Sequence, residues 1–272
     1  MPLRQYARGK AMDIKGVAID MAKRAGGLLK KNLGRARKVE FKGAVDIVTE
    51  MDLLSEELIV KAIRKNFPGH AILTEESGEM ATGSPFRWIV DPLDGTTNYT
   101  HGYPAFCVSI AFEEKGEVTF GVVYGPMLDE LFISERGKGA YLNGKRIRVS
   151  KTGMLGSSLL ATGFPYDLRT SSENNLGHFS NFALRSQAIR RAGSAALDLS
   201  YVGCARFDGF WELKLKPWDL AAASLIVKEA GGRISDFKNN PFSIYCQDVL
   251  ATNGLIHDEM VTVLNMGCRG SL

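Results

Sequence analysis

The chain has 272 residues, of which 45% are hydrophobic and 24% are charged, a composition typical of globular proteins with room for a sizeable core. Its 34 basic and 30 acidic residues leave a formal charge of +4, too small a surplus to indicate nucleic-acid binding. The four cysteines form no CxxC pair, and no apolar run has the length of a membrane span or the position of a signal-peptide core, which predicts a cytoplasmic protein without a disulfide framework or zinc site.

The first half of the chain predicts two amphipathic helices followed by strands. Residues 1–12 form a basic extension before the first patterned segment. The expected elements, in chain order, are a helix over 13–33, a hairpin or loop over 37–48, a helix over 53–67, buried strands over 71–73 and 88–90, and an antiparallel meander over 106–149.

The second half predicts strands and helices in alternation, which is typical of layered α/β structures. The expected strands cover 158–162, 188–191, 207–213, 233–236 and 248–252. The expected helices cover 173–185, 195–204 and 218–230, and one further helix follows the last strand. We interpret 13–265 as a single domain with halves at about 13–150 and 151–265, followed by a short tail over 266–272.

The strongest chemical signal follows the strand at 88–90, where the sequence reads DPLDGTTN from Asp91 to Asn98. Two carboxylates three residues apart, in a turn that Pro92 stiffens, can face one cavity, where they repel each other unless a cation lies between them. Oxygen ligands of this kind favour magnesium or manganese over zinc. The glycine and threonines that follow can begin a helix whose free N–H groups hold a phosphate. The alternative, an ordinary acidic turn and helix cap, is disfavoured for so specific a string.

Three other acidic residues have ordinary structural explanations when each is taken alone. Glu75 follows a short strand, as solvated carboxylates often do. Asp219 follows Pro217 at a predicted helix start, where an acidic residue commonly caps the helix. Asp52 has the N3 position of a capping box begun by Thr49. The functional weight of all three acids therefore depends on the DPLDGTTN motif.

Four segments, taken in order, resemble the motifs of the inositol monophosphatase family. They are KGAVDIVTEMD, ILTEES, WIVDPLDGTTNYTHGYPAFCVSIAF and KPWDLAAASLIVKEAGG, and the resemblance extends over most of the chain. It implies an α/β (α+β) fold, a layered αβαβα sandwich, and a homodimer. It also implies a magnesium-dependent, lithium-sensitive phosphatase that hydrolyses the phosphate monoester of a small polyol, such as myo-inositol monophosphate, with water as the attacking group.

The same resemblance implies roles for individual residues around two or three Mg²⁺ ions, or Mn²⁺. The implied metal ligands are Glu75, Asp91, the carbonyl of Leu93, Asp94 and Asp219. The implied catalytic residues, which orient or activate the attacking water, are Asp52, Glu75 and Thr96. The implied substrate contacts are Glu75, Leu93, Asp94, Gly95, Thr96, Gly193, Ser194, Ala195, Glu212 and Asp219. Lys42 corresponds to a lysine of a loop near the third metal ion.

The motifs leave the substrate open, because fructose-1,6-bisphosphatases share the metal core and differ on the sugar side. A nucleotide-bisphosphate phosphatase is disfavoured, since the sequence offers no clear basic or aromatic site for an adenosine. An alternative of another class is a protein that associates with RNA polymerase or nucleic acid and keeps the phosphatase core, although the charge marks no such surface. A haloacid-dehalogenase-type phosphatase is disfavoured because its two aspartates are two residues apart, whereas Asp91 and Asp94 are three apart.

Overall fold

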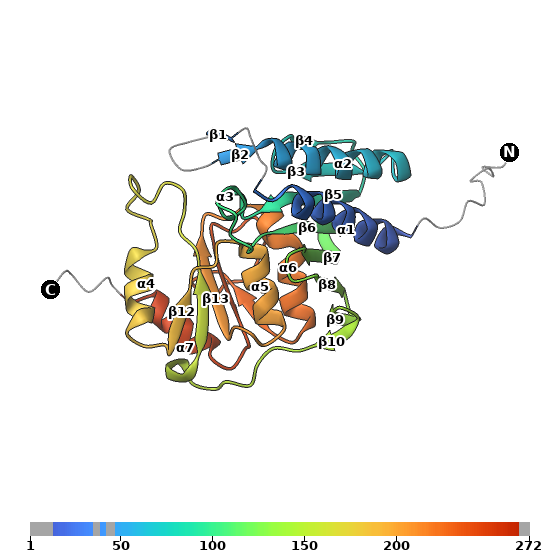
Figure 1. Ribbon diagram of the computed structural model, residues 1–272. Coiled ribbons are helices and arrows are strands. Elements are labelled where there is room, and N and C mark those ends of the chain that lie inside the picture. The colour runs from blue at the N-terminus through green and yellow to red at the C-terminus, as the bar shows by residue number, and fades with distance from the viewer. Residues whose placement is uncertain (1–12, 35–38, 42–46, 267–272) are drawn as a thin grey trace.

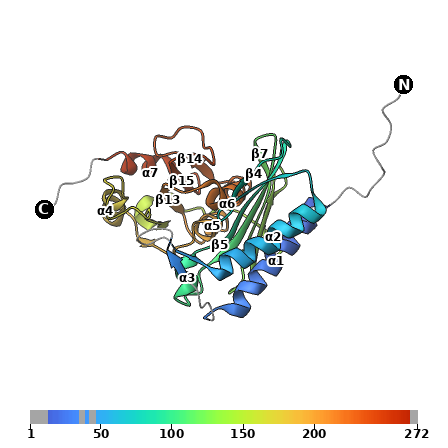
Figure 2. The ribbon, with the colours of Figure 1, turned by 90° about the horizontal axis from the view of Figure 1, so that it is seen from above.

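Two main β-sheets, a separate two-stranded sheet and three layers of helices make up the structure, a computed structural model that describes residues 13–34, 39–41 and 47–266 (Figure 1). Seen from above, the layers follow one another as helix, sheet, helix, sheet and helix (Figure 2). The expected αβαβα sandwich is thereby confirmed. The extension over 1–12 and the tail residues 267–272 lie outside the described residues. Within the described ranges, no helix combines the length and the apolar character needed to cross a membrane.

The first helical layer consists of α1 (Ile14–Asn32) and α2 (Glu50–Asn66), which pack against each other and against one face of the large sheet. α1 buries side chains spaced three or four residues apart, as an amphipathic helix does. These side chains are Ala18, Met21, Ala22, Ala25 and Leu29. Between the helices, β1 (Val39–Phe41) and β2 (Ile47–Thr49) pair antiparallel, as a hairpin does. Both helices and the hairpin lie where the sequence pattern predicts them.

The large sheet has eight strands in the order β10-β9-β8-β7-β6-β5-β3-β4. Its strands are β3 (Ala71–Thr74), β4 (Gly78–Met80), β5 (Phe86–Asp94), β6 (Cys107–Glu114), β7 (Glu117–Gly125), β8 (Glu130–Glu135), β9 (Gly139–Leu142) and β10 (Lys145–Ile147). β3 and β5 are parallel, and all other neighbours are antiparallel. The strands from β6 to β10 are the predicted meander. β4 escaped prediction because three residues with the sequence GEM carry no alternation signal.

β5 is longer than the sequence predicts, and this difference positions the central motif. The predicted strand ended at Val90, but β5 continues to Asp94 and pairs with β6 on both sides of an irregularity between Asp91 and Asp94. A bulge of this kind lets a strand re-aim side chains while it stays in the sheet. The two aspartates therefore belong to the bulged end of a buried strand rather than to a separate turn.

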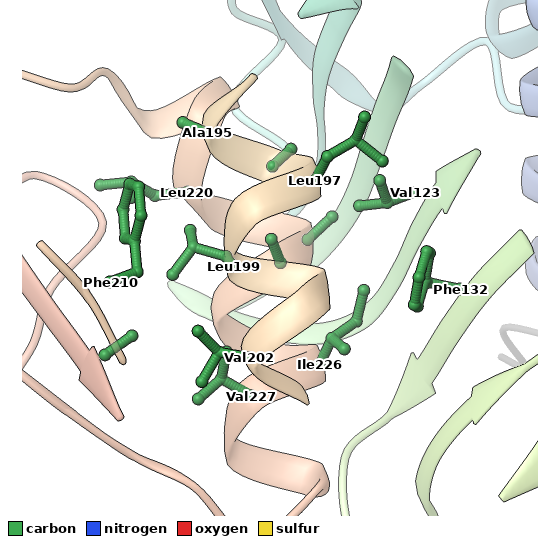
Figure 3. Close-up of a cluster of buried hydrophobic side chains, with 14 of the residues drawn as sticks. Val123, Phe132, Ala195, Leu197, Leu199, Val202, Phe210, Leu220, Ile226 and Val227 are labelled. Atoms are coloured by element: carbon green, nitrogen blue, oxygen red, sulfur yellow. The ribbon is translucent and has the colours of Figure 1, made fainter. Parts of the chain in front are cut away.

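Two helices fill the middle layer between the sheets. They are α5 (Ala195–Gly203) and α6 (Pro217–Glu229), which pack against each other and against strands of both sheets. Figure 3 shows Leu199 and Val202 of α5 and Ile226 of α6 among apolar side chains that include Phe132 of the large sheet and Phe210 of the small one. This core fixes the two helices, and with them the residues at their N-terminal ends.

The small sheet has five strands in the order β12-β11-β13-β15-β14. These strands are β11 (Leu159–Thr162), β12 (Ala188–Arg190), β13 (Gly209–Leu213), β14 (Arg233–Ser235) and β15 (Asp248–Thr252). The last helical layer, α4 (Leu176–Ala183) and α7 (His257–Leu264), packs against this sheet on the side away from α5 and α6. The predicted alternation of strands and helices in the second half is correct, with boundaries that differ by a few residues.

Candidate active site

A single pocket of about 440 Å³ brings most of the predicted site residues together. Its walls come from the end of β5, the short helix α3 (Thr96–Thr100), the segment after β11, the N-terminal ends of α5 and α6, and β13 with the residues after it. Its volume lies in the range of small-molecule sites. The predicted residues that line it are Glu75, Asp94, Gly95, Thr96, Gly193, Ser194, Ala195, Glu212 and Asp219.

Asp94 joins the large sheet to the middle helical layer. Its Oδ2 accepts hydrogen bonds from Ser194 Oγ at 2.6 Å and from the backbone N–H of Ala196 at 2.8 Å. Ser194 itself makes no side-chain cap for α5, so the carboxylate of Asp94 caps this helix from a distant part of the chain. One carboxylate oxygen is thus held by the scaffold. Asp94 is consequently fixed at the pocket wall.

Asp91 is a buried carboxyl group and Asp219 is a half-buried one, and both lie close to Asp94. Burial raises the pKa of Asp91 well above its usual value, and the charges of Glu75, Asp94 and Asp219 raise it further. Burial and the charge of Asp94 likewise raise the pKa of Asp219. Each group is oriented by a backbone donor, the N–H of Leu93 to Asp91 Oδ1 at 3.0 Å and the N–H of Lys216 to Asp219 Oδ2 at 2.7 Å. Their mutual repulsion means that the ionised forms need a nearby cation.

Asp52 and Thr96 form a second group, linked by hydrogen bonds to the end of β5. Asp52 Oδ2 accepts from the N–H and the hydroxyl of Thr49 at 2.8 and 2.5 Å, which is the predicted capping box. The hydroxyl of Thr96 lies 2.9 Å from Asp52 Oδ1 and 3.1 Å from the carbonyl oxygen of Leu93. Burial raises the pKa of Asp52, although the bonds from Thr49 and Thr96 oppose this shift. Asp52 therefore combines a structural cap with a contact to Thr96.

The turn into α3 requires the glycine of the motif. Gly95 has φ = 97°, and a Cβ atom there would lie 2.9 Å from the carbonyl oxygen of Ala105. The amide of Asn98 donates to the carbonyls of Ala105 and Ala192 at 2.6 and 2.8 Å and so ties this turn to the segment before α5. The backbone at Gly95 and Thr96 therefore lies at the pocket in a fixed conformation.

Glu212 of β13 is a buried carboxyl group that lines the same pocket. Its carboxyl lies against Gly163, where a Cβ atom would come within 2.0 Å of Glu212 Oε1. Burial raises the pKa of Glu212 to about 8, while the positive charge of Arg191 opposes the shift. A group of this kind can exchange hydrogen bonds with the hydroxyl groups of an alcohol in the pocket.

The donor set fits hard divalent cations better than zinc. Carboxylate and carbonyl oxygens without histidine or thiolate are the ligands of magnesium and manganese, and at this pocket they come from three different segments. Among the described residues, no three His, Cys, Asp or Glu side chains already stand in coordinating geometry. The carboxyl groups lie near one another, and their chemistry matches a hard divalent cation.

The sequence did not predict a role for several residues that lie at the site. Glu56 of α2 is buried and accepts hydrogen bonds from the N–H of Glu76 and the hydroxyl of Ser77, which fixes the segment that carries Glu75. Gly163 and Asp198 line the pocket, but neither belongs to a recognisable motif. Only the three-dimensional contacts identify them. Lys42, by contrast, was predicted and lies outside the described residues.

Comparisons with known proteins agree over most of the chain. The model of the "Inositol monophosphatase family" matches residues 12–265. The "Inositol-1-monophosphatase" of Synechocystis is 46% identical over 85% of this chain and 81% of its own length. The "Nus factor SuhB" of Escherichia coli is 44% identical over 90% of this chain and 93% of its own. The solved structure of the inositol monophosphatase from Anabaena is similar with a TM-score of 0.86 and 41% identity, covering 94% of this chain and 97% of that one.

Proposed function

The chain belongs to the inositol monophosphatase family and is a phosphatase, and from this premise we propose that it hydrolyses the phosphate monoester of a small polyol with magnesium as cofactor. We take myo-inositol monophosphate as the preferred substrate, with inositol and phosphate as products. The observation that carries the proposal is a pocket lined by Asp94, Asp219 and Glu212, with the buried carboxyl group of Asp91 close to Asp94 and Asp219. The aspartates suit a cation and a phosphate, and Glu212 suits the hydroxyl groups of an alcohol.

The residues that would hold the cations are Glu75, Asp91, Asp94, Asp219 and the carbonyl of Leu93. When bound, such ions neutralise charge on a phosphoryl group and lower the pKa of water. Asp91 and Asp219 are oriented for this role by backbone N–H donors, and Asp94 by Ser194 and Ala196. These hydrogen bonds restrict the orientations of all three carboxyl groups before a cation binds.

The pair of Asp52 and Thr96 is suited to orient the attacking water. The hydroxyl of Thr96 donates towards Asp52 Oδ1 and the carbonyl of Leu93, so its lone pairs are left to accept a hydrogen bond from water. Asp52 keeps a carboxylate within reach of the hydroxyl and can take up a proton through it. The N–H groups of Gly95 and Thr96 lie at the same wall and would receive phosphate oxygens.

A phosphate-release assay on purified protein tests this proposal. The panel contains inositol 1-phosphate, fructose 1,6-bisphosphate, glycerol 2-phosphate and adenosine 3′,5′-bisphosphate, each with magnesium, with manganese and with excess chelator. We expect the highest kcat/KM on inositol 1-phosphate, dependence on the divalent cation, and inhibition by lithium. Full turnover in excess chelator would contradict the metal assignment, and a higher kcat/KM on fructose 1,6-bisphosphate would favour the sugar-bisphosphatase alternative.

Assembly and location form part of the same proposal. We expect a homodimer in the cytoplasm, in keeping with the family resemblance. Sedimentation analysis of the full chain measures the first expectation, and fractionation of cells that express it measures the second. A monomer at all accessible concentrations would contradict the homodimer.

A second candidate function follows from the names of several relatives. The Escherichia coli protein that covers 90% of this chain is named a Nus factor, which favours a role in transcription for that relative. We propose for this chain, as a secondary role, association with RNA polymerase alongside the phosphatase activity. A pull-down with the full chain on purified RNA polymerase tests it, with Asp219→Asn as a control that separates binding from catalysis. No capture at physiological salt would contradict this role.

A further inference from the structure

The pocket contains a buried carboxyl group that the roles assigned so far do not use. Asp198 lies in the first turn of α5, lines the pocket, and is only 1% exposed. Its Oδ1 atom has no hydrogen-bond partner within the described part of the chain. Burying an unpaired carboxyl oxygen is unfavourable, so its retention at a pocket wall indicates a partner that arrives with a ligand.

Asp208 and Asp94 are also buried aspartates, but unlike Asp198 Oδ1 their oxygens accept hydrogen bonds from donors within the protein. Asp208 accepts hydrogen bonds from Ser150 Oγ at 2.5 Å and from the N–H of Leu159 at 2.7 Å, and it does not line the pocket. Asp94 is likewise held on one oxygen by two donors. Donors within the protein thus bind these two acids, whereas Asp198, which also lines the pocket, has a carboxyl oxygen without a partner in the described part of the chain.

The surroundings of Asp198 define the chemistry that it can bind. Burial raises the pKa of Asp198, the nearby charges of Glu212 and Asp94 raise it further, and the positive charge of Arg191 opposes the shift. Glu212 faces the same pocket, and Arg191 is exposed at its wall. A second anion is disfavoured next to these carboxyl groups. An alcohol hydroxyl, which is neutral and both donates and accepts, matches an unpaired carboxyl oxygen.

We propose that Asp198 is a specificity-determining residue that binds one hydroxyl of the substrate alcohol while Glu212 binds a neighbouring hydroxyl. The site would then select cyclic polyols with two adjacent hydroxyl groups over alcohols that lack them. This inference rests on the proposed phosphatase function and adds a second recognition group to the alcohol side of the pocket. Buried polar groups of a site discriminate strongly against a substrate that leaves them unpaired.

The test compares Asp198→Leu with Asp198→Asn, because both side chains have the branched shape of aspartate and only asparagine keeps hydrogen-bonding atoms. We expect Asp198→Leu to lower kcat/KM for inositol 1-phosphate relative to glycerol 2-phosphate about five- to tenfold, the value of one hydrogen bond. We expect Asp198→Asn to keep most of the selectivity. Asp208→Asn is the matched control, and we expect it to lower the melting temperature and leave the selectivity ratio unchanged.

The outcomes separate this inference from the function on which it rests. If the wild-type protein does not prefer inositol 1-phosphate to glycerol 2-phosphate, the proposed substrate class and this inference both fail. If the wild type has that preference and Asp198→Leu keeps it, or loses activity equally on both substrates, Asp198 has no part in recognition.

A series of singly deoxygenated inositol phosphates supplies a second measurement that does not depend on the folding of Asp198→Leu. In the wild type, removal of either of two adjacent hydroxyls should lower kcat/KM. In Glu212→Gln, sensitivity to one of these hydroxyls should fall while sensitivity to its neighbour remains. Sensitivity to a single hydroxyl in the wild type would overturn the proposal, as would loss of both sensitivities in Glu212→Gln.

Discussion

Some carboxylates of the pocket both stabilise the fold and belong to the proposed cation site. Asp94 is the clearest case. One of its oxygens caps α5 through Ser194 and Ala196, so the acid that would bind a cation also fixes a helix of the middle layer. Asp219 similarly accepts from the N–H of Lys216 at the start of α6. A substitution at either position therefore has to be examined for stability as well as for activity.

Replacing Asp94 or Asp219 with asparagine should lower kcat/KM by about 100-fold or more, because metal-ion catalysis supplies several kcal/mol. Asparagine keeps an oxygen that can accept the backbone hydrogen bonds, so the fold should persist. Initial rates on inositol 1-phosphate with saturating magnesium measure the loss, and circular dichroism verifies the fold. Wild-type rates in both variants would exclude these residues as metal ligands.

Gly163 should affect substrate selectivity, because its lack of a side chain leaves room for the carboxyl group of Glu212. In Gly163→Ala the new methyl group would overlap the Glu212 carboxyl, since an ideal Cβ lies 2.0 Å from Oε1. We expect the displaced carboxyl to give the same phenotype as Glu212→Gln, a larger fall of kcat/KM on cyclitol phosphates than on glycerol 2-phosphate. The measurement is the ratio of the two kcat/KM values in each variant.

Gly27→Ala is the matched control for this substitution. Gly27 lies in α1, and a Cβ atom there meets no other atom within 4 Å. Alanine should leave the selectivity unchanged and stabilise the helix slightly. If Gly163→Ala behaves like Gly27→Ala, the contact between Gly163 and Glu212 does not limit substrate choice.

At the scale of elements, the sequence predicted those whose signal is local. The spacing of apolar residues predicted α1 and α2, and the motif of Thr49 and Asp52 predicted the capping box, because each depends on residues close in sequence. The bulged end of β5 was not predicted, since its shape depends on pairing with β6. Likewise, no local pattern indicates that Asp94 caps α5, because the two are about one hundred residues apart in the chain.

The start of α7 should make stability depend on pH through His257. Its ring is buried between Ser235 Oγ, 3.0 Å from Nε2, and Thr252 Oγ1, 2.9 Å from Nδ1. Burial, with Arg233 nearby, lowers the pKa of His257 to about 4. The unfolded chain, with a histidine pKa near 6.5, binds more protons below that pH. Stability from this residue should therefore be complete above about pH 6.5 and decline as the pH falls towards 4.

Melting temperatures of the wild type and His257→Gln between pH 4.5 and 8 measure this contribution. Glutamine keeps polar atoms but does not titrate, so the difference between the two proteins should shrink as the pH falls. The site carboxyl groups have raised pKa values in both proteins and cancel in this difference. Parallel curves across the whole range would exclude His257 as the source of acid sensitivity.

At the scale of the whole molecule, the pocket lies where separate layers meet. Asp91 and Asp94 come from the large sheet, Asp219 from the middle helices, and Glu212 from the small sheet. The sequence motifs predicted that these residues act together, through their resemblance to a family. They could not predict Gly163 or Asp198, whose roles depend on how β13 and α5 pack around the cavity. The sequence thus predicted the acidic residues that would hold a cation better than the residues that surround Glu212.

This junction leads to a prediction about the stability of the entire domain. Without a cation, the burial of several like charges disfavours the folded state, as the raised pKa of Asp91 indicates. A cation that binds only the folded protein should stabilise it, by about 2.7 kcal/mol at a concentration 100 times the Kd. We therefore expect magnesium to raise the melting temperature of the wild type in a concentration-dependent way. Thermal unfolding in chelator and at increasing magnesium concentrations measures the effect.

Asp219→Asn should reverse the order of stability in these two conditions. In chelator the variant should melt at or above the temperature of the wild type, because one charge of the buried group has been removed while the asparagine oxygen can still accept from the N–H of Lys216. In magnesium its melting temperature should rise much less than that of the wild type. The reason is that Asp219, one of the residues that would hold the cation, has been replaced. A sodium chloride series at matched ionic strength controls for screening. If Asp219→Asn melts well below the wild type in chelator, Asp219 primarily stabilises α6; an equal response of both proteins to magnesium would exclude a cation at this junction.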